Sequence, residues 1–259
     1  MKTNLLLTLF LLSCLNLFSQ TVPSYIPTSG LVAWYPFNGN ANDESGNGNN
    51  GVVNGGVTLT SNRNNTANTA YAWPTSGGTT NFINIGNIHT LTPLSISISA
   101  WIFMDGGSLG PRIISSGEVG IGTPTSNNIN RTFNINFATS QINSVAIPSL
   151  SWQHLLYTYD NTTGDSRLYI NGILTNYTPN GVRTTYNYVA WNIGRKSISA
   201  FDSWGGKIDD VAIWSRNLTS SEVTNVYNAN TLAIAKSELL NYKIYPNPVI
   251  NKLNIDIEN

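Results

Sequence analysis

The residues of this sequence best suited to hold a ligand are oxygen donors in a Gly-rich stretch near its start. Asn38, Asn40 and Asp43 follow one another there at short intervals, with Asn42 and Glu44 beside them. Calcium ions in proteins take such carboxylate and amide oxygens from a tight loop. The stretch therefore predicts one structural calcium near Asp43. An Asn/Gly turn with solvated side chains is the alternative, because Asn is frequent throughout this sequence.

Aromatic residues form the second set of candidate binding residues. Four lie near predicted strand ends and in predicted loops: Tyr186, Tyr188, Trp191 and Trp204. A lectin-type site stacks an aromatic ring on a sugar and surrounds it with amide groups, so these four are the candidate ligand-binding residues. Packing in the core is the alternative for each. The remaining tryptophans fall within strand patterns and are expected in the core: Trp34, Trp73, Trp101, Trp152 and Trp214.

The sequence does not have the residue spacing of a hydrolase. A retaining glycosidase holds two carboxyl groups about 5–5.5 Å apart, and alternate positions of one strand supply such a pair. The five glutamates are instead far apart: Glu44, Glu118, Glu222, Glu238 and Glu258. His89 and His154, the two histidines, accompany no Gly-x-Ser-x-Gly motif. His154 is expected to be half-buried beside Trp152 in a strand. The sequence therefore predicts a protein that is not an enzyme.

The low charge of the chain excludes some classes of partner. Its 259 residues include 13 basic and 13 acidic side chains, so 10% are charged, against about 25% in an average globular domain. A nucleic-acid-binding surface needs a basic patch, and electrostatic docking on a membrane needs a basic cluster. Neither partner is expected. Cys14 is the only cysteine, so a chain that loses its leader is expected to form no disulfide.

Residues 1–20 are predicted to be a secretory signal peptide. Lys2 supplies the positive charge, and residues 5–18 form an apolar run that is too short to span a bilayer. Ser19 and Gln20 supply the small and polar residues of a cleavage site. A lipoprotein signal ending at Cys14 is the alternative, although Leu12 is large for its position in such a signal. We therefore expect an exported protein without a transmembrane segment.

Residues 21–230 are predicted to form one all-β domain of short antiparallel strands. Apolar–polar alternation with a period of two, bounded by Gly, Asn, Pro and Ser, indicates strands. The expected strands are Leu31–Phe37, Leu94–Phe103, Arg131–Ala138, Trp152–Tyr159, Arg167–Ile170, Ile173–Tyr177, Tyr188–Ile193 and Lys207–Trp214. Asn171-Gly172 lies between two of them and predicts a type I′ hairpin turn, because both central residues of that turn need positive φ.

One short helix is expected to close the domain. Thr219 and Glu222 have the spacing of a capping box, in which the two residues satisfy each other's backbone N–H groups. An apolar stripe at helical spacing follows: Val223, Val226 and Tyr227. The helix is expected to end near Asn228–Asn230.

Several stretches, in this order, resemble the LamG-like jelly-roll family of the concanavalin A-like lectin/glucanase superfamily. They are Gly30–Gly51, Ser97–Ile102, Trp152–Asp160, Arg167–Gly172, Ile193–Arg195, Gly206–Trp214 and Leu218–Tyr227. The resemblance implies two antiparallel sheets packed as a jelly-roll β-sandwich. It also implies a calcium ion between an early loop and a late strand, where Asp209 and Asp210 are the candidates. Because strand neighbours point to opposite faces, one of the two would be the ligand.

The end of the sequence differs in character from this domain. Residues 231–241 are predicted to be a linker, and residues 242–259 resemble the opening of a type IX secretion sorting domain. Tyr245–Pro248 and Leu253–Ile255 carry this resemblance. The family's domain continues further, so residues 242–259 would be a truncated copy. The resemblance implies a secreted or outer-surface protein of a Gram-negative bacterium, with the type IX secretion machinery as a partner.

These observations favour a secreted or cell-surface recognition module without catalysis, above all for carbohydrate binding or adhesion. Glycans or a cell-surface protein are then the expected partners. A structural or adhesive module that contacts proteins and has no small-ligand site is the alternative. A glycan hydrolase is a weaker alternative, because no carboxylate pair has the required spacing. The carbohydrate hypothesis rests in part on the family resemblance, since a fold alone does not fix function.

Overall fold

The computed structural model describes most of residues 22–228 and two short segments near the C-terminus. The described residues are 22–74, 80–88, 95–105, 112–116, 119–122, 134–136, 141–143, 148–179, 182, 190–195, 204–228, 242–245 and 254–257. The following sequence predictions lie outside them: the signal peptide with Cys14, His89, Tyr186, Tyr188, the linker over 231–241 and most of the sorting-domain motif.

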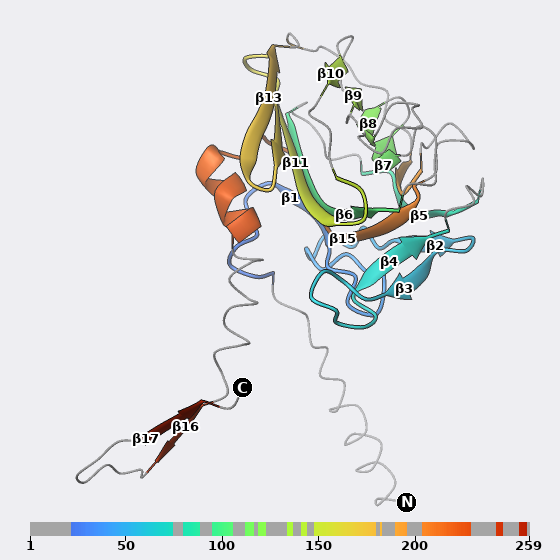
Figure 1. Ribbon diagram of the computed structural model, residues 1–259. Helices are drawn as coiled ribbons and strands as arrows, with labels where there is room; N and C mark the ends of the chain where they lie inside the picture. Colours follow the sequence, from blue (N-terminus) through green and yellow to red (C-terminus); the bar gives the residue numbers. More distant parts are fainter. Residues whose placement is uncertain are drawn as a thin grey trace, which may run out of the picture.

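Two antiparallel sheets make up the domain (Figure 1). The strands of the larger sheet are β1 Leu31–Tyr35, β3 Thr58–Thr60, β4 Ala70–Trp73, β6 Ile96–Met104, β11 Trp152–Asp160, β12 Asp165–Ile170, β13 Ile173–Pro179 and β15 Gly206–Trp214. They follow the order β13-β12-β11-β6-β15-β4-β3, and β1 also pairs with β15. The smaller sheet contains β2 Val52–Asn54, β5 Phe82–Gly86, β7 Arg112–Ser116, β8 Val119–Gly122, β9 Asn134–Asn136, β10 Gln141–Asn143 and β14 Trp191–Ile193. Its order is β10-β9-β8-β7-β14-β5-β2.

The main hydrophobic core lies between the two sheets. From β6 it takes alternate residues, each at most 2% exposed: Ile96, Ile98, Ala100 and Ile102. The smaller sheet supplies residues such as Ile83, Ile114 and Trp191. The predicted period-two pattern of β6 is confirmed, and so is the predicted fold class of an antiparallel sandwich with one short helix.

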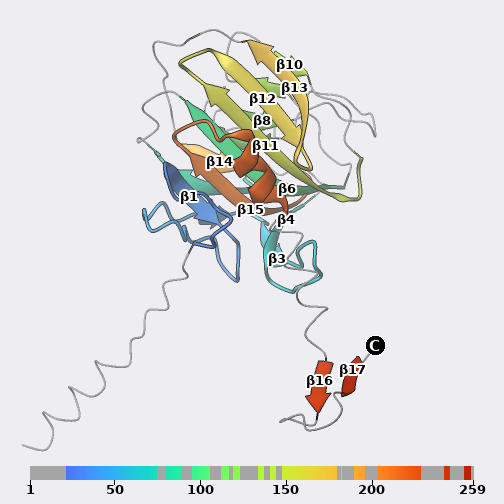
Figure 2. The ribbon, with the colours of Figure 1, turned by 90° about the vertical axis from the view of Figure 1, so that its left-hand side faces the viewer.

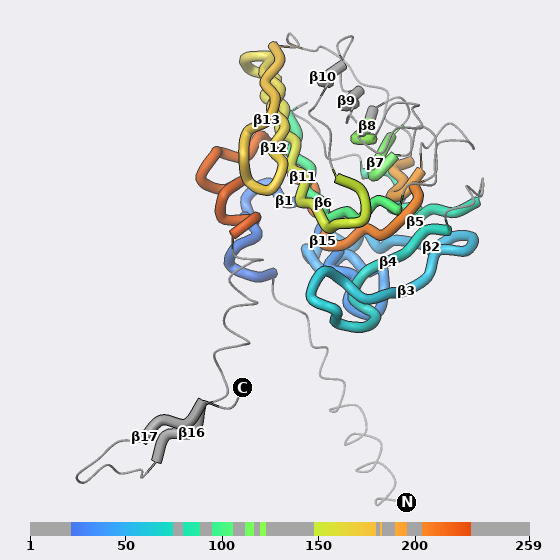
Figure 3. Tube along the Cα trace, viewed as in Figure 1, coloured from blue at the N-terminus to red at the C-terminus, as the bar shows by residue number. Residues whose placement is uncertain are grey.

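The outer face of the larger sheet is covered as well. The helix over residues 220–228 and the first described residues, 22–30, lie on this face (Figures 2 and 3). With the sheet they enclose a second, smaller core: Ile26, Trp34, Leu156, Tyr169, Ala212, Trp214, Leu218, Val223 and Val226. Trp214 also donates its indole N–H to the carbonyl oxygen of Pro27 at 2.7 Å. Because both faces are covered, the central strands are buried along most of their length.

The first strand departs from the alternation predicted for Leu31–Phe37. Ala33, Tyr35 and Phe37 face the main core as expected, but Leu31 packs against the outer core. The register between β1 and β15 shifts between Leu31 and Ala33. A bulge of this kind inserts one residue and changes the face to which the neighbouring side chains point. Strict alternation over Leu31–Phe37 predicts that Leu31 shares the face of Ala33, Tyr35 and Phe37, and this expectation was wrong.

The predicted hairpin turn and helix cap are both confirmed. Asn171 and Gly172 have φ values of 49° and 76°, as a type I′ turn requires. The N–H of Glu222 donates to Thr219 Oγ1 at 3.3 Å, and the N–H of Thr219 donates to the Glu222 carboxylate at 2.9 Å. Arg216 donates two further hydrogen bonds to that carboxylate. These bonds, with that of Arg216 the strongest influence, lower the pKa of Glu222 to about 2.

Near the C-terminus, β16 Tyr242–Tyr245 and β17 Asn254–Ile257 pair as antiparallel strands. This part of the chain therefore contains β-structure, while its identity as a sorting domain stays a prediction. Within the ranges given above, no helix has the length and hydropathy needed to cross a bilayer.

Candidate functional site

Asp43 organises the oxygen-rich loop between β1 and β2. This residue is 8% exposed. Its Oδ1 accepts the backbone N–H groups of Trp34 at 3.0 Å and Ser45 at 2.9 Å. Its Oδ2 accepts the N–H of Asn49 at 2.9 Å. A carboxylate that binds three backbone donors closes a loop firmly, because hydrogen bonds to a charged acceptor are strong.

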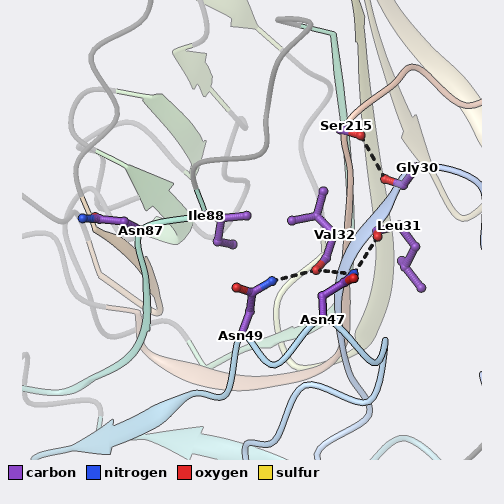
Figure 4. A pocket seen from close by; sticks show the side chains of 8 residues that line it. All are labelled: Gly30, Leu31, Val32, Asn47, Asn49, Asn87, Ile88 and Ser215. Carbon is purple, nitrogen blue, oxygen red and sulfur yellow. Dashed lines mark hydrogen bonds between the residues drawn. The ribbon is translucent and has the colours of Figure 1, made fainter.

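The same loop lines a pocket beside the start of β1, here called the asparagine pocket (Figure 4). Its volume is about 400 Å³, and it is lined by Gly30, Leu31, Val32, Asn47, Asn49, Asn87, Ile88 and Ser215. Asn47 Nδ2 donates to the carbonyl oxygens of Leu31 and Val32 at 2.9 and 3.0 Å. Asn49 Nδ2 donates to the Val32 oxygen at 2.8 Å. The backbone of β1 therefore fixes both carboxamides, and Asn49 Oδ1 points away from β1 (Figure 4).

The asparagine pocket presents neutral polar groups beside apolar ones. Among the described residues that line it, none carries a charge. Asn47 and Asn87 are exposed, whereas Val32 and Ile88 are 4% and 2% exposed. Carboxamides both donate and accept hydrogen bonds, and the volume falls within the range of about 300–1,000 Å³ typical of ligand pockets. The arrangement suits an uncharged ligand rich in hydroxyl groups.

Arg63 joins Asp209 and Asp210 in a buried ion-pair cluster. Its Nη1 lies 2.8 Å from Asp209 Oδ2, and its Nη2 lies 2.7 Å from Asp210 Oδ2. The register of β15 shifts between Asp209 and Ala212, and Asp210 has a φ of 46°. This bulge directs both carboxylates to one guanidinium. The expectation that Asp209 and Asp210 point to opposite faces was therefore wrong, because it assumed a regular strand.

The cluster lines a second pocket, here called the arginine–aspartate pocket. Its volume is about 200 Å³, and its lining residues are Pro23, Tyr25, Trp34, Pro36, Asn38, Asn62, Arg63, Asn64, Asp209 and Asp210. Burial raises the pKa of Asp209 well above its usual value, and the charge of Asp210 adds to the effect. Burial also raises the pKa of Asp210, while Arg63 opposes both shifts. Carboxyl groups with such perturbed pKa values in a pocket mark a candidate functional site.

The contacts of the carboxylates do not fit the calcium ion predicted near Asp43. Both Asp43 oxygens already accept backbone N–H groups, and Asp209 and Asp210 face a guanidinium that would repel a cation. Asn40 accepts a backbone N–H within the loop, whereas Asn38 lines the same pocket as the aspartate pair. No group of three Asp, Glu, His or Cys side chains placed for a metal occurs within the described part of the chain. These contacts therefore argue against the calcium ion that the sequence predicts, and a melting experiment with and without calcium tests it.

We expect the chain to melt at the same temperature in excess calcium and in EDTA. An ion bound at a hundredfold excess over its Kd would add about 2.7 kcal/mol, which is a shift of about 5–11 °C at ~2–4 °C per kcal/mol. Differential scanning fluorimetry measures the difference. A shift of that size in the parent, absent in Asp43→Asn, would establish the calcium site instead.

Trp191 and Trp204 do not present their rings to a ligand. Both are 0% exposed and belong to the core between the sheets. Their assignment as ligand-binding residues was wrong, and packing, the alternative for these aromatics, is what the structure shows. Of the tryptophans expected in the core, four are buried: Trp34, Trp73, Trp101 and Trp214. Trp152 is half-buried and packs edge-on against Phe103, with ring centroids 5.9 Å apart.

His154 is buried completely, and its neighbours are not those expected. Its ring packs against Trp101 and Tyr227, with centroids 5.2 and 5.7 Å away, rather than against Trp152. His154 Nε2 lies 2.8 Å from Ser99 Oγ. Burial, with a further contribution from Arg63, lowers the pKa of His154 to about 3. Since His154 and Ser99 are 0% and 2% exposed, the Ser–His pair stabilises the fold and is closed to a substrate.

Sequence reasoning missed residues that shape both pockets. They are Tyr25, Arg63, Asn47, Asn49 and Asn87. Arg63 carried a usable signal, since it is the only charged residue between Glu44 and Asp105. A lone charge in a long neutral stretch of a folded domain often has a partner elsewhere. The asparagines carried none, because Asn is common along the whole chain.

Solved structures share this fold. The chain is similar to domain 4 of AbnA, a GH43 extracellular arabinanase from Geobacillus stearothermophilus solved with arabinotriose, with a TM-score of 0.51 and 20% identity over 77% of this chain and 98% of that one. It is also similar to the binding domain of botulinum neurotoxin serotype D/C, with a TM-score of 0.58 and 19% identity over 77% of this chain and 52% of that one. A third similar structure is the binding domain of botulinum neurotoxin DC in complex with SialylT. Its TM-score is 0.57, and its identity is 16% over 78% of this chain and 52% of that one. The chain thus spans about half the length of these toxin domains.

No curated protein matches the chain. One family model does match it, that of the concanavalin A-like lectin/glucanases superfamily, over residues 76–224. The match runs from just before β5 into the helix that follows β15, and it covers more than half of the chain. It confirms the family resemblance noted for the domain, whereas the residues predicted to begin a sorting domain lie outside it. The chain belongs to the concanavalin A-like lectin/glucanases superfamily.

Proposed function

We propose that this chain is an exported carbohydrate-binding module without catalytic activity, and that the asparagine pocket is its glycan site. The observation that carries the proposal is the set of carboxamides from Asn47, Asn49 and Asn87 beside apolar Ile88. Sugar hydroxyl groups pair with amide donors and acceptors, and the C–H faces of a sugar ring pack against apolar side chains.

The rigidity of the asparagine pocket supports this proposal. Asn47 and Asn49 are already bonded to the backbone of β1, and Tyr35 donates its hydroxyl to the Asn49 carbonyl oxygen at 2.6 Å. A ligand therefore orders few side chains when it binds, which lowers the entropic cost of association. The exposed rim and the absence of a charged group among the described lining residues favour a neutral oligosaccharide over an ionic ligand.

The carboxylates and the related structures support binding rather than hydrolysis. Asp209 and Asp210 are neighbours on one bulge and share one guanidinium, whereas a glycosidase places its two carboxyl groups on either side of the scissile bond. The arabinanase domain was solved with arabinotriose and one toxin binding domain with SialylT. Export is supported by the apolar run over residues 5–18. An outer-surface destination is supported only by the Tyr245–Pro248 motif.

A glycan array tests the proposed function. We expect the purified chain to retain one class of neutral oligosaccharide. Asn87→Ala removes a carboxamide that makes no hydrogen bond to the described part of the chain, so folding is unaffected. Because one hydrogen bond contributes about 0.5–1.5 kcal/mol, this variant is expected to weaken glycan binding about three- to tenfold in a calorimetric titration.

Asn42→Ala is the matched control. Asn42 is an exposed asparagine of the same loop that does not line the pocket, and only its backbone N–H is bonded there. We expect it to bind glycans as the parent does. Failure of the parent to retain any glycan would overturn the proposal in favour of an adhesive module that contacts proteins. Equal losses in both variants would place the glycan site elsewhere.

A further inference from the structure

The hydrogen bonds of the asparagine pocket fix which atoms of two carboxamides face a ligand. Asn47 Nδ2 lies 2.9 and 3.0 Å from the carbonyl oxygens of Leu31 and Val32, and it also lies 3.1 Å from a hydroxyl, Ser45 Oγ. Asn49 Nδ2 lies 2.8 Å from the same Val32 oxygen. Carbonyl oxygens only accept hydrogen bonds, so the NH2 group of each carboxamide must point at β1. Turning either side chain over would place its amide oxygen against a backbone oxygen.

The oxygen atoms of these two carboxamides remain open to a ligand. Asn47 Oδ1 and Asn49 Oδ1 accept no hydrogen bond from the described residues. Both side chains line the pocket, and Asn49 Oδ1 points away from β1 (Figure 4). Because both NH2 groups bond to one oxygen, that of Val32, the two carboxamides are neighbours. The pocket thus presents two fixed acceptors side by side.

Fixed donors are scarcer than fixed acceptors in this wall. The three contacts of Asn47 Nδ2 use both of its hydrogens, and Asn49 Nδ2 retains one N–H. The N–H and the hydroxyl of Ser215 both donate to the carbonyl oxygen of Gly30, at 2.8 and 3.3 Å. Asn87 differs, because its carboxamide makes no hydrogen bond to the described residues and can turn either group to a ligand.

Acceptors in the protein require donors in the ligand. A hydroxyl group has one O–H donor, and an acetyl or methyl group on its oxygen removes that donor. A carboxylate or a sulfate only accepts, so its charge would face the amide oxygens. An ammonium group donates, but among the described lining residues no carboxylate compensates its charge. Free hydroxyl groups of a neutral glycan therefore fit the two oxygens.

We propose that the asparagine pocket recognises its glycan by accepting hydrogen bonds from two unsubstituted hydroxyl groups, one at Asn47 Oδ1 and one at Asn49 Oδ1. The pocket then binds neutral glycans with free hydroxyls and rejects the same glycans once these hydroxyls are acetylated or methylated. This specificity rests on the proposed function and adds to it the direction of the deciding hydrogen bonds. Each lost bond is expected to weaken binding about three- to tenfold.

An array of matched pairs tests the class of ligand. Each neutral oligosaccharide is printed with free hydroxyls and again in O-acetylated form, with cellotetraose, xylotetraose and mannotetraose among them. We expect the purified chain to retain at least one free form. Its acetylated partner loses both donors and is expected to bind about tenfold more weakly or worse.

Monodeoxyfluoro derivatives of the most strongly retained oligosaccharide separate the loss of a donor from added bulk, because fluorine is no larger than a hydroxyl group and cannot donate. In calorimetric titrations we expect at least two positions at which fluorine weakens binding about three- to tenfold. Asn49→Ala should remove the loss at one of them and Asn47→Ala the loss at the other. Asn87→Ala is the control from the same pocket, and it should keep both losses. Each loss is a ratio measured on one protein, so a partly unfolded variant does not change it.

The specificity and the proposed function can fail separately. An array that retains no free form would overturn the proposed function and this specificity with it. Equal binding of free and acetylated forms, or fluorine derivatives that all bind like the parent sugar, would overturn the specificity alone. Fluorine losses that persist in both Asn47→Ala and Asn49→Ala would also overturn it, because other atoms would then accept the hydroxyl groups.

Discussion

Replacing Arg63 with Met is expected to destabilise the domain by about 3–5 kcal/mol at neutral pH. This is the usual loss when one partner of a buried ion pair is removed and the other charge stays buried. Asp209 is 1% exposed and would remain next to Asp210 with no cation beside it. Arg63 also lies over the Trp101 ring, 4.5 Å from its centroid, so the variant loses a cation–π contact too.

Urea unfolding followed by tryptophan fluorescence measures this loss. Arg167→Met is the matched control, because Arg167 pairs with Asp165 at 3.1 Å on an exposed hairpin, where ion pairs contribute about 0–1 kcal/mol. Combining Arg63→Met with Asp209→Asn and Asp210→Asn removes the buried charges and should recover part of the stability. A loss below about 1 kcal/mol in Arg63→Met alone would show that the cluster is solvated.

The fold was largely predictable because its strands follow local rules. The alternation of β6 depends only on which face each residue occupies, and the Asn171-Gly172 turn depends only on two positive φ values. Capping by Thr219 and Glu222 is similarly local. The bulges near Leu31 and Asp210 were not predictable, because they arise from pairing with strands that are distant in sequence.

The sites were much less predictable, since both pockets join distant segments. Arg63 and Asp209 are 146 residues apart, and no sequence pattern around either residue indicates that the two form an ion pair. Trp191 and Trp204 lie near predicted strand ends in the sequence, yet both are buried in the core between the two sheets. The oxygen-rich loop was recognised, but its chemistry was not: Asp43 binds backbone N–H groups and thereby positions Asn49, whose side chain lines a pocket.

The outer face of the larger sheet connects the charged cluster to the buried histidine. Asp209, Trp101 and His154 occupy adjacent positions across β15, β6 and β11. Arg63 lies over Trp101, which separates the aspartates from His154. The guanidinium charge therefore acts on His154 as well as on the carboxylates, and it adds to the effect of burial in lowering the pKa of His154.

Stability is accordingly expected to fall steeply as the pH is lowered below about 6.5. The unfolded chain protonates His154 near its ordinary pKa of about 6.5, whereas the folded chain holds the pKa near 3. Between these values the unfolded state binds the extra proton. The contribution of His154 is thus complete above pH 6.5 and is lost by up to about 1.4 kcal/mol per pH unit as the pH falls toward 3.

The difference between the parent and His154→Gln isolates this contribution from other groups. Asp209 and Asp210 have raised pKa values in the folded chain, so the folded state binds protons more readily and these two residues make the domain more stable as the pH falls. The pKa of Glu222 is lowered to about 2. Its contribution to the stability of the domain is also lost in acid, but only below the ordinary pKa of about 4.5. Gln keeps a polar group near Ser99 and cannot be protonated in this range.

Urea unfolding of both proteins at intervals between about pH 7 and pH 5 should therefore give curves that converge as the pH falls. This pH window lies above the range in which Glu222 changes its protonation. The convergence of the two stability curves therefore measures the contribution of His154. His89→Gln, at the chain's only other histidine, is the matched substitution, and it should retain the acid sensitivity of the parent. Parallel curves for the parent and His154→Gln would mean that His154 takes up a proton in the folded domain. In that case the outer core beneath the helix would have to open to water at mild acid pH, and the Ser99–His154 contact would not be the closed pair that its burial indicates.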